Sequence, residues 1–178
     1  MTTTRAGTGS GVGIRQATRL DLLAVLRIER ASFDQPWPFA AFERYLGEPG
    51  FLVATAGPDR TGDDAYRFDE SGDDESSESV LGYVVADLVA NHGRGLGHVK
   101  DVAVHPDHRG EGVGGALLER TLSVLGARGA RSVKLEVRES NHRALSLYDD
   151  FGFEHLRTVP RYYDDGEDAL IMVVDLDA

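Results

Sequence analysis

The chain has 178 residues, 41% of them hydrophobic, which suits one globular domain with a sizeable core. It has no cysteine, so disulfides, thiolate metal sites and a cysteine nucleophile are excluded. The formal net charge of −11 at pH 7 disfavours nucleic acid as a partner, because phosphate contacts need a cationic face.

The same bulk properties give two further expectations. No apolar run approaches the roughly 18–20 residues of a membrane span, and the N-terminus lacks the apolar stretch of a secretory signal. We therefore expect a cytoplasmic protein with no membrane partner. Lys100 and Lys134 are its only lysines, and the acidic surface resembles that of halophilic proteins, in which salt screens the repulsion. The alternative is an acidic protein adapted to ordinary salt.

In chain order, residues 1–11 are rich in Thr, Gly and Ser and predict a disordered tail before one domain at 12–178. The next elements predicted are a strand at 12–16, a helix capped by Thr18, a short helix at 39–46 and a strand at 51–55. The apolar face of the first helix is predicted from Leu20, Leu23, Ala24, Leu26 and Ile28. Residues 57–79 are polar and acidic and predict a solvated loop inserted between strands.

The second half of the chain continues as mixed α/β. Strands are predicted at 80–89 and 98–104, a helix at 112–125, a strand over 133–137, a helix at 141–151 and strands at 153–158 and 169–175. Val133, Leu135 and Val137 alternate with charged residues, so Glu136 lies on the opposite face of its strand from this apolar set.

A glycine-rich loop precedes the helix at 112–125 within HPDHRGEGVGGALLE, residues 105–119. It fits G-x-G-x-x-G, and Glu136 follows at about the 20-residue distance of a dinucleotide-binding fingerprint. A Rossmann fold is nevertheless excluded by context, because residues 105–109 separate the preceding strand from the glycines and too few residues follow for a second half. A loop without lysine is also no P-loop. Unfilled N–H groups at a helix N-terminus, with Arg109 beside them, still suit a pyrophosphate.

Four stretches in order resemble the GCN5-related N-acetyltransferases (GNAT), and within them the RimI-type N-terminal protein acetyltransferases. They are IERASFDQPWP, VAVHPDHRGEGVGGALLE, LEVRESNHRALSLYDDFGF and RYYDDGEDALIM. The resemblance implies the GNAT fold, a twisted, mostly antiparallel sheet of about seven strands with about four helices, splayed between strands 4 and 5. It also implies acetyl-CoA as co-substrate, direct attack by an amine, and no metal. His105 and His108 flank Pro106 without an evident third ligand, so they predict no metal site either.

By resemblance, the backbone of Val102, Ala103 and Val104 binds the pantetheine arm of the cofactor like an added strand. Asn141 would contact the cofactor near the following helix, and the alternative for this residue is a helix N-cap. The implied pyrophosphate-binding residues are Arg109, Gly110, Glu111, Gly112, Val113, Gly114 and Gly115.

The resemblance makes Glu136 the general base, acting through water, and Tyr148 the proton donor to the departing thiolate. The alternatives are an exposed charge on a strand for Glu136 and a ring packed in the core for Tyr148. Phe33, Pro36 and Trp37 are implied to flank the peptide groove, and the alternative is a hydrophobic lid.

Tyr162 and Tyr163 are the other implied groove residues, with an aromatic hairpin as the alternative. The expected acceptor is the α-amino group of a protein or peptide, a ribosomal protein among the candidates. Deprotonating it at pH 7 costs about 1 kcal/mol, against roughly 4–5 kcal/mol for lysine. A GNAT enzyme acting on lysine or a small amine, and a non-catalytic acyl-CoA-binding module, remain alternatives. We expect a monomer or weak dimer.

Overall fold

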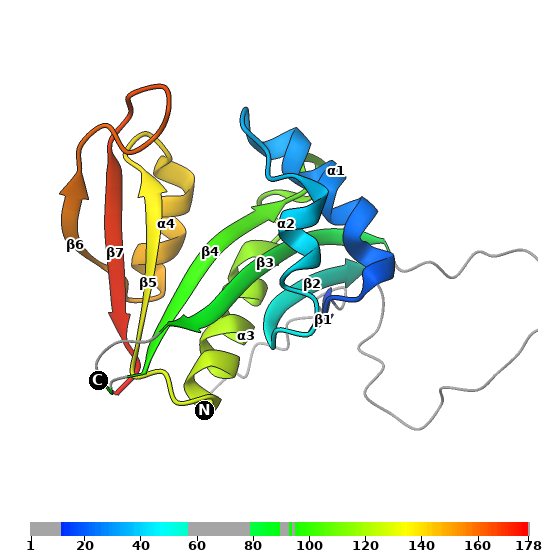
Figure 1. The fold of residues 1–178 in the computed structure, drawn as a ribbon, viewed down its shortest axis with the longest axis horizontal. Coiled ribbons are helices and arrows are strands. Elements are labelled where there is room, and N and C mark those ends of the chain that lie inside the picture. Colours follow the sequence, from blue (N-terminus) through cyan, green and yellow to red (C-terminus); the bar gives the residue numbers. More distant parts are fainter. Residues whose placement is uncertain (1–11, 57–78, 90–92, 94, 178) are drawn as a thin grey trace, which may run out of the picture.

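The computed structural model describes residues 12–56, 79–89, 93 and 95–177 (Figure 1). The predicted tail at 1–11 and residues 57–78 of the acidic insertion lie outside the described residues. The described part forms one seven-stranded sheet with four α-helices, which confirms the predicted mixed α/β class. None of these helices is long and apolar enough to cross a membrane.

The elements follow the predicted order closely. The strands are β1 (Val12–Gln16), β2 (Gly50–Ala56), β3 (Val80–Val89), β4 (Leu96–Val104), β5 (Ser132–Arg138), β6 (Glu154–Val159) and β7 (Ala169–Asp175). The helices are α1 (Leu22–Ser32), α2 (Phe39–Glu43), α3 (Val113–Ala127) and α4 (His142–Asp150), with 3-10 turns η1 (Arg19–Asp21) and η2 (Pro106–His108).

The sheet has the strand order β1-β2-β3-β4-β5-β7-β6 and is antiparallel except at its centre. There β4 and β5 run parallel and pair only where residues 96–99 face residues 132–135. Beyond this short ladder the two strands separate, as Figure 1 shows. The predicted splay between strands 4 and 5 is therefore confirmed.

An extra residue in β4 lies at the point where the strands separate. Against β3, Asp101 pairs with Val85 and Val99 pairs with Ala86, so Lys100 is left over in the ladder. Such a β-bulge bends its strand and increases the local twist. The bend directs residues 101–104 away from β5, and their β5-facing edge has no strand partner among the described residues.

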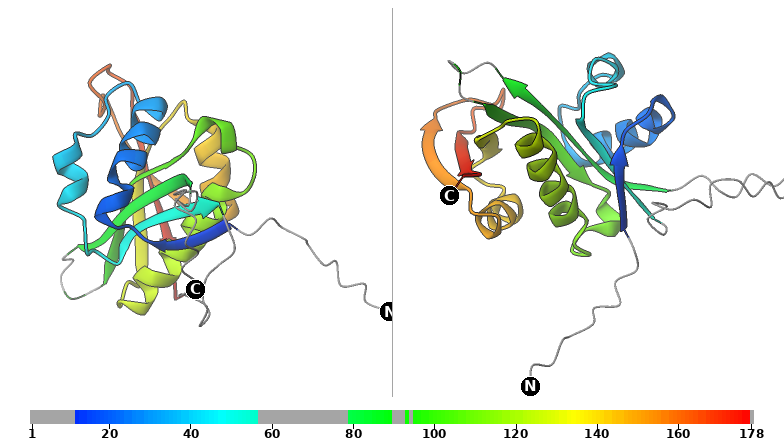
Figure 2. Two further views of the ribbon diagram at one scale, coloured as in Figure 1. Left: turned by 90° about the vertical axis from the view of Figure 1, so that its right-hand side faces the viewer. Right: turned by 90° about the horizontal axis from the view of Figure 1, so that it is seen from below.

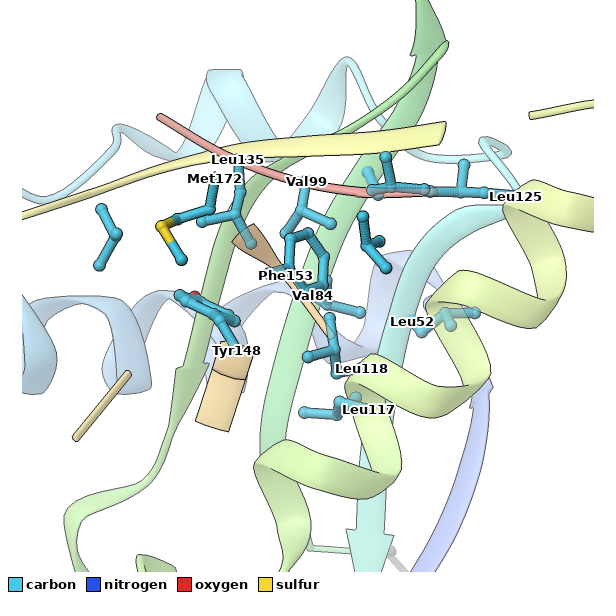
Figure 3. Packing of buried hydrophobic residues seen from close by; sticks show 14 of the residues in the cluster. Leu52, Val84, Val99, Leu117, Leu118, Leu125, Leu135, Tyr148, Phe153 and Met172 are labelled. Carbon is cyan, nitrogen blue, oxygen red and sulfur yellow. The ribbon is translucent and has the colours of Figure 1, made fainter. Parts of the chain in front are cut away.

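The helices cover opposite faces of the sheet (Figure 2). On one face α3 and α4 pack over a core that includes Leu117, Val84 and Tyr148 (Figure 3). On the other face α1 and α2 cover an aromatic core in which the ring of Phe42 lies 5.5 Å from that of Tyr83, edge to face. The sheet thus has two buried faces, and β4 contributes side chains to both.

The first helix buries only part of the predicted face: Leu26 and Ile28 are buried as predicted, whereas Leu20 and Leu23 are not. The Asp21 carboxylate accepts hydrogen bonds from the N–H (2.8 Å) and hydroxyl (3.0 Å) of Thr18, and a 3-10 turn comes before the α-helix. This turn changes the helical phase. Leu20 and Leu23 are 93% and 63% exposed, so their predicted burial was wrong. The buried residues of α1 are Leu22, Val25, Leu26, Ile28 and Glu29.

Candidate active site

The glycine loop connects η2 to α3 through two glycines in the left-handed region. Gly110 has φ 81° and Gly112 has φ 86°, conformations that side-chain-bearing residues rarely adopt. Gly112 is the N-cap of α3, and no side chain caps this helix end. The first N–H groups of the helix therefore have no helical acceptor and are available to an anion.

The other residues of the predicted pyrophosphate set lie differently. Val113 is buried in the α3 core. A Cβ on Gly114 would lie 3.3 Å from Leu147 Cδ2 in α4, so the small residue allows α3 and α4 to approach closely. Gly115 likewise faces α4. Glu111 is exposed, and its carboxylate lies 3.1 Å from Nδ1 of His108. The glycines of this loop therefore have two uses: Gly114 and Gly115 allow α4 to pack closely, and Gly110 and Gly112 allow the backbone turn that leaves N–H groups open to a ligand.

Arg109 turns its guanidinium toward the ends of β4 and α1. Its Nε donates to the carbonyl of Val104 and its Nη2 to Oγ of Ser32, both at 3.1 Å. Its side chain thus connects the glycine loop to the last residue of α1, directly before the predicted substrate segment at 33–37. This structural contact was not predicted from the sequence.

The side chains of the two histidines before the loop contact residues close in sequence. Nδ1 of His105 accepts a hydrogen bond from the N–H of Asp107 at 3.1 Å, and His108 contacts Glu111. Within the described ranges no group of three or more His, Asp or Glu side chains is arranged to hold a metal ion.

The predicted pantetheine strand lies at the free edge of β4. Ala103 is buried under α1 and α2, whereas Val102 and Val104 pack toward the α3 core. Their side chains therefore hold the strand in the sheet, and their backbone faces the gap left by β5. Such an unpaired edge suits an extended amide-containing ligand, which binds as an added strand.

Glu136 is the first residue of β5 beyond its ladder with β4, where Leu135 pairs with Val99. Its side chain is 17% exposed, and Oε2 lies 2.6 Å from Nε2 of His98 on β4. Lys134 Nζ lies 3.4 Å from Oε1. Burial acts to raise the pKa of Glu136, but His98 and then Lys134 outweigh it and lower the pKa below its usual range. Glu136 is therefore ionised at neutral pH.

Tyr148 packs in the core, as the alternative for this residue predicted, and its role as proton donor stays a prediction. Its ring is buried in the α3–α4 core, 5.7 Å from the ring of Phe153 (Figure 3). Burial raises the pKa of its hydroxyl, and the charges of Asp101 and Tyr163 raise it further. Tyr148 is therefore a protonated phenol at neutral pH. The groups that act on its pKa lie on β4 (Asp101) and in the β6–β7 loop (Tyr163).

Asn141 forms the N-cap of α4, because its side-chain oxygen accepts the N–H of Ala144 at 3.2 Å. This was the alternative considered for it. Its cofactor contact stays a prediction. The capping bond uses the amide oxygen, which leaves the NH₂ group as a donor for a second partner.

The segment between α1 and α2 places its three predicted residues unequally. The ring of Trp37 packs on the rings of Phe42 (5.5 Å between centres) and Tyr45 (6.0 Å). This packing is the hydrophobic lid that was the alternative for this segment. The backbone N–H of Trp37 donates to Oε1 of Glu29 at 2.7 Å. Phe33 and Pro36 are exposed. The segment is thus anchored at Trp37 and presents Phe33 and Pro36 outward.

Tyr162 and Tyr163 lie in the loop between β6 and β7, with their rings 5.1 Å apart and edge to face. Burial raises the pKa of Tyr163 to about 12, with Glu136 among the charges that contribute. Burial and the charge of Glu136 also raise the pKa of Tyr162. The structure therefore brings both tyrosines into the electrostatic range of Glu136, although 26 or more residues separate them in sequence.

Arg138 holds this loop against β5. Its guanidinium carbon lies 3.9 Å from the centre of the Tyr163 ring, and Nη1 donates to Asp165 and Glu167, each at 2.8 Å. Glu167 also accepts the N–H of Ser140 at 2.9 Å. One arginine thus fixes the tyrosines relative to the strand that bears Glu136.

For the peptide acceptor and acetyl-CoA that the resemblance implies, replacing Arg138 by lysine is expected to raise the KM for the peptide about fivefold to tenfold while leaving the KM for acetyl-CoA unchanged. The substitution keeps the charge but removes the planar stacking and paired hydrogen bonds, worth roughly 1 kcal/mol in all. Steady-state kinetics with each substrate varied in turn measures the effect. Arg131→Lys, at an exposed pair with Asp177 3.7 Å away, is the matched control. Equal increases in both KM values would contradict this assignment.

A buried acidic cluster near the site was not predicted. Glu29 of α1 is 1% exposed and accepts the Tyr83 hydroxyl through Oε2. The Tyr83 oxygen also lies 2.9 Å from Oδ2 of Asp101 on β4. A signal for Glu29 was available, because it follows Leu22, Val25 and Leu26 at the helical spacing of a buried stripe.

Comparisons with known proteins agree with this geometry. The profile of the acetyltransferase (GNAT) family matches residues 22–153. The N-alpha-acetyltransferase of Sulfolobus acidocaldarius is 33% identical over 174 residues, which cover 92% of this chain and 92% of that protein.

Two solved structures extend the comparison. The ribosomal-protein-S18-alanine N-acetyltransferase of Escherichia coli has a TM-score of 0.71 and 27% identity, covering 93% of this chain and 94% of that one. The NatC complex bound to Gag peptide and CoA has a chain with a TM-score of 0.76 and 19% identity, covering 93% and 98%, which shows the fold alone. The predicted enzyme class, an acetyl-CoA-dependent N-acetyltransferase, is confirmed. Since the profile spans most of the described sheet and the archaeal relative spans nearly the whole length, the chain belongs to the acetyltransferase (GNAT) family.

Proposed function

We propose that this enzyme is an N-terminal protein acetyltransferase, which transfers the acetyl group of acetyl-CoA to the α-amino group of a protein or peptide. The observation that carries the proposal is the position of Glu136. Its ionised carboxylate lies where β4 and β5 separate, beside His98 and within electrostatic range of Tyr162 and Tyr163. The activities named for the archaeal and bacterial relatives support this acceptor class.

The residues present fit acetyl-CoA. The uncapped N-terminus of α3 offers N–H groups and a favourable dipole to the pyrophosphate. The free edge of β4 at 102–104 offers backbone groups to the amides of the pantetheine arm. When bound, acetyl-CoA supplies a thioester carbonyl as the acyl donor. A pantetheine arm held along residues 102–104 would bring this thioester to the gap between β4 and β5.

Glu136 removes a proton from the substrate ammonium group, directly or through a water molecule. An α-amino group with a pKa of about 7.7–8.0 needs only about 1 kcal/mol for this at pH 7. The low pKa of Glu136 makes it a modest base, and such a base suits an α-amino group better than lysine, whose deprotonation costs roughly 4–5 kcal/mol. His98 holds the carboxylate in place through their 2.6 Å contact.

Tyr148 donates its proton to the departing thiolate of CoA. The raised pKa of its hydroxyl keeps that proton available at neutral pH. A backbone N–H at the end of β4 would be the donor available to the carbonyl oxygen of the bound thioester. No enzyme-bound acyl intermediate is needed, because the amine attacks the thioester directly.

Two loops bind the acceptor peptide. Tyr162 and Tyr163 lie on the β5 side, and Phe33 and Pro36 lie on the α1 side. Figure 1 shows that the β6–β7 loop and the C-terminal end of α1 lie at the same end of the molecule, where β4 and β5 diverge. A peptide N-terminus between these loops points toward Glu136.

A peptide-library assay tests the proposal. Peptides with a free N-terminus and no lysine should release CoA thiol and gain one acetyl group by mass spectrometry. Matched peptides with a blocked N-terminus and one lysine should react much more slowly. The assay is run at low and at 1 M or higher KCl, because the surface is strongly acidic.

Two outcomes would overturn the proposal. Turnover of lysine peptides or small amines, with free N-termini inert, would move the acceptor to another amine class. Binding of acetyl-CoA without turnover of any amine would favour a non-catalytic acyl-CoA-binding module.

A further inference from the structure

A hydrogen-bonded group of three acids lies beside the predicted thioester site. Glu29 comes from α1, Tyr83 from β3 and Asp101 from β4, so three elements distant in sequence meet at one point. Glu29 is fully buried, whereas Asp101 is only partly buried. The group therefore extends from the interior under α1 to the edge of β4. We call these three residues the Glu29 cluster.

Counting protons shows that the Glu29 cluster is not fully ionised. The hydroxyl of Tyr83 has one hydrogen, yet its oxygen is within hydrogen-bond distance of a carboxylate oxygen of both Glu29 and Asp101. Tyr83 donates to Glu29, so the second contact needs a hydrogen on the Asp101 carboxyl. Burial, the charge of Glu29 and a hydrogen bond with Glu29 raise the pKa of Asp101 well above its usual range, in line with this count.

Among the described residues no cation pairs with the carboxyls of the Glu29 cluster, so the proton they share is what reduces their negative charge. Lys100 of β4 is paired with Asp87 of β3 at 3.2 Å and lies over the ring of Tyr45 after α2. Arg109 bonds Ser32 and Val104. In the described part of the chain, no Lys, Arg or His forms an ion pair with Glu29 or Asp101. Two adjacent carboxyl groups without a cation share a proton, because both cannot be ionised cheaply.

The position of Asp101 connects this proton to the reaction. Asp101 directly precedes residues 102–104, where the proposed function places the pantetheine arm. It also lies on the same face of the sheet as Glu136, because His98 and Asp101 both point away from the α3 core. The cluster therefore has one partly exposed carboxyl on the sheet face that bears Glu136.

We propose that Asp101 is a further acid–base residue of acetyl transfer, with Glu29 and Tyr83 as the residues that hold its proton. The amine nitrogen loses two protons as its bond to carbon forms and the carbon–sulfur bond breaks. Glu136 passes the first to solvent. The carboxylate of the cluster accepts the second, which leaves both of its carboxyls protonated.

The cluster then releases this extra proton, and the Tyr148 phenolate that forms when the thiolate takes the hydroxyl proton regains one. One proton thus ends on the thiol, one in solvent, and the enzyme returns to its starting state. This inference rests on the proposed use of Glu136 and Tyr148 but applies to any amine acceptor.

Asp101→Asn tests the proposal, because the amide has nearly the shape of a protonated carboxyl and its NH₂ group can donate to the Tyr83 oxygen. The variant should fold and bind acetyl-CoA as the wild type does. Its kcat should fall about tenfold to a hundredfold, the lower part of the usual range for general acid–base catalysis. The acidic limb of its pH–kcat profile should also lose one inflection. Unchanged kcat and an unchanged profile would show a purely structural carboxyl and overturn the proposal.

Asp87→Asn is the matched control, because Asp87 lies on the neighbouring strand, faces Lys100 and is outside the cluster. It should leave kcat and the pH profile unchanged.

Infrared spectroscopy gives a readout that does not depend on activity. The wild type should show the C=O band of a protonated carboxyl at neutral pH, lost in Asp101→Asn and kept in Asp87→Asn. Absence of this band in the wild type would refute the proton count. If free N-termini prove inert, the proposed acceptor fails, whereas the band and the kinetics with the true acceptor still test Asp101.

Discussion

Glu136→Gln is expected to lower kcat by about 10²–10⁴-fold, the range of a lost general base, while acetyl-CoA binds with unchanged affinity. Glutamine has the shape of glutamate and can still contact His98, but it cannot accept a proton at neutral pH. The side chain lies on the face opposite Leu135 and Val137, so the core is not altered. Single-turnover kinetics with a peptide acceptor and calorimetric titration with acetyl-CoA measure the two quantities separately.

The pH profile adds an independent check on Glu136. Its pKa is lowered in the folded protein, so the carboxylate is fully ionised above the unfolded-state value of about 4.3. Its contribution to stability is present above that pH and is lost as the pH falls through the folded-state pKa. In the neutral range, the rate should therefore follow the ionisation of the substrate amine.

Variants of His98 test whether this histidine lowers the pKa of Glu136. His98→Ala removes the main group that lowers the pKa of Glu136, so the pKa of this carboxyl should rise and the acidic limb should move to higher pH. Lys134→Gln, which removes a longer 3.4 Å contact, should give a smaller shift in the same direction. Wild-type kcat in Glu136→Gln would exclude this residue as the base.

Tyr148→Phe is expected to reduce kcat by about a hundredfold with nearly unchanged stability. The ring would still pack on Phe153, and among the described residues the hydroxyl makes no hydrogen bond that its loss would leave unsatisfied. A structural residue would behave in the opposite way, with lower stability and retained kcat. Thermal unfolding and steady-state kinetics of the same preparation distinguish the two.

Phe153→Leu is the matched control for the ring contact. Phe153 is buried beside Tyr148 but has no group that transfers a proton. Its loss should lower stability by roughly 1–1.5 kcal/mol, as for hydrophobic swaps in a core, with little change in kcat. A fall in kcat equal to that of Tyr148→Phe would mean that packing, rather than the hydroxyl, determines the rate.

The sheet could be predicted well because its strands have strong local signals. The bounds of β3 and β7 match the sequence prediction, since apolar residues dominate both strands and polar segments flank them. The phase of α1 could not be predicted in this way. Thr18 and Asp21 form a 3-10 turn whose hydrogen bonds rotate the helix, so Leu20 and Leu23 became exposed.

Site residues that belong to a sequence motif could be predicted. Contacts between residues on strands distant in sequence could not. Glu136 and the glycine loop belong to recognisable stretches. His98 was missed because its partner Glu136 is 38 residues away, across a short parallel ladder that periodicity does not predict. The side chain of Arg109 was placed with the glycine loop, but its partner Ser32 is 77 residues away. Such contacts depend on tertiary packing alone.

The bulge at Lys100 has a consequence for which residues can act together. Side chains alternate along a regular strand, so His98 and Asp101, three positions apart, belong on opposite faces. One additional residue reverses this parity and places both on the face of Glu136 and Tyr83. Pairing Lys100 into a regular ladder would send either the histidine or the aspartate into the α3 core, whereas deleting Lys100 would leave the two residues two positions apart and on one face. Accommodating Lys100 as a bulge thus keeps the partner of Glu136 and the carboxyl of Asp101 in one compartment rather than divided by the sheet.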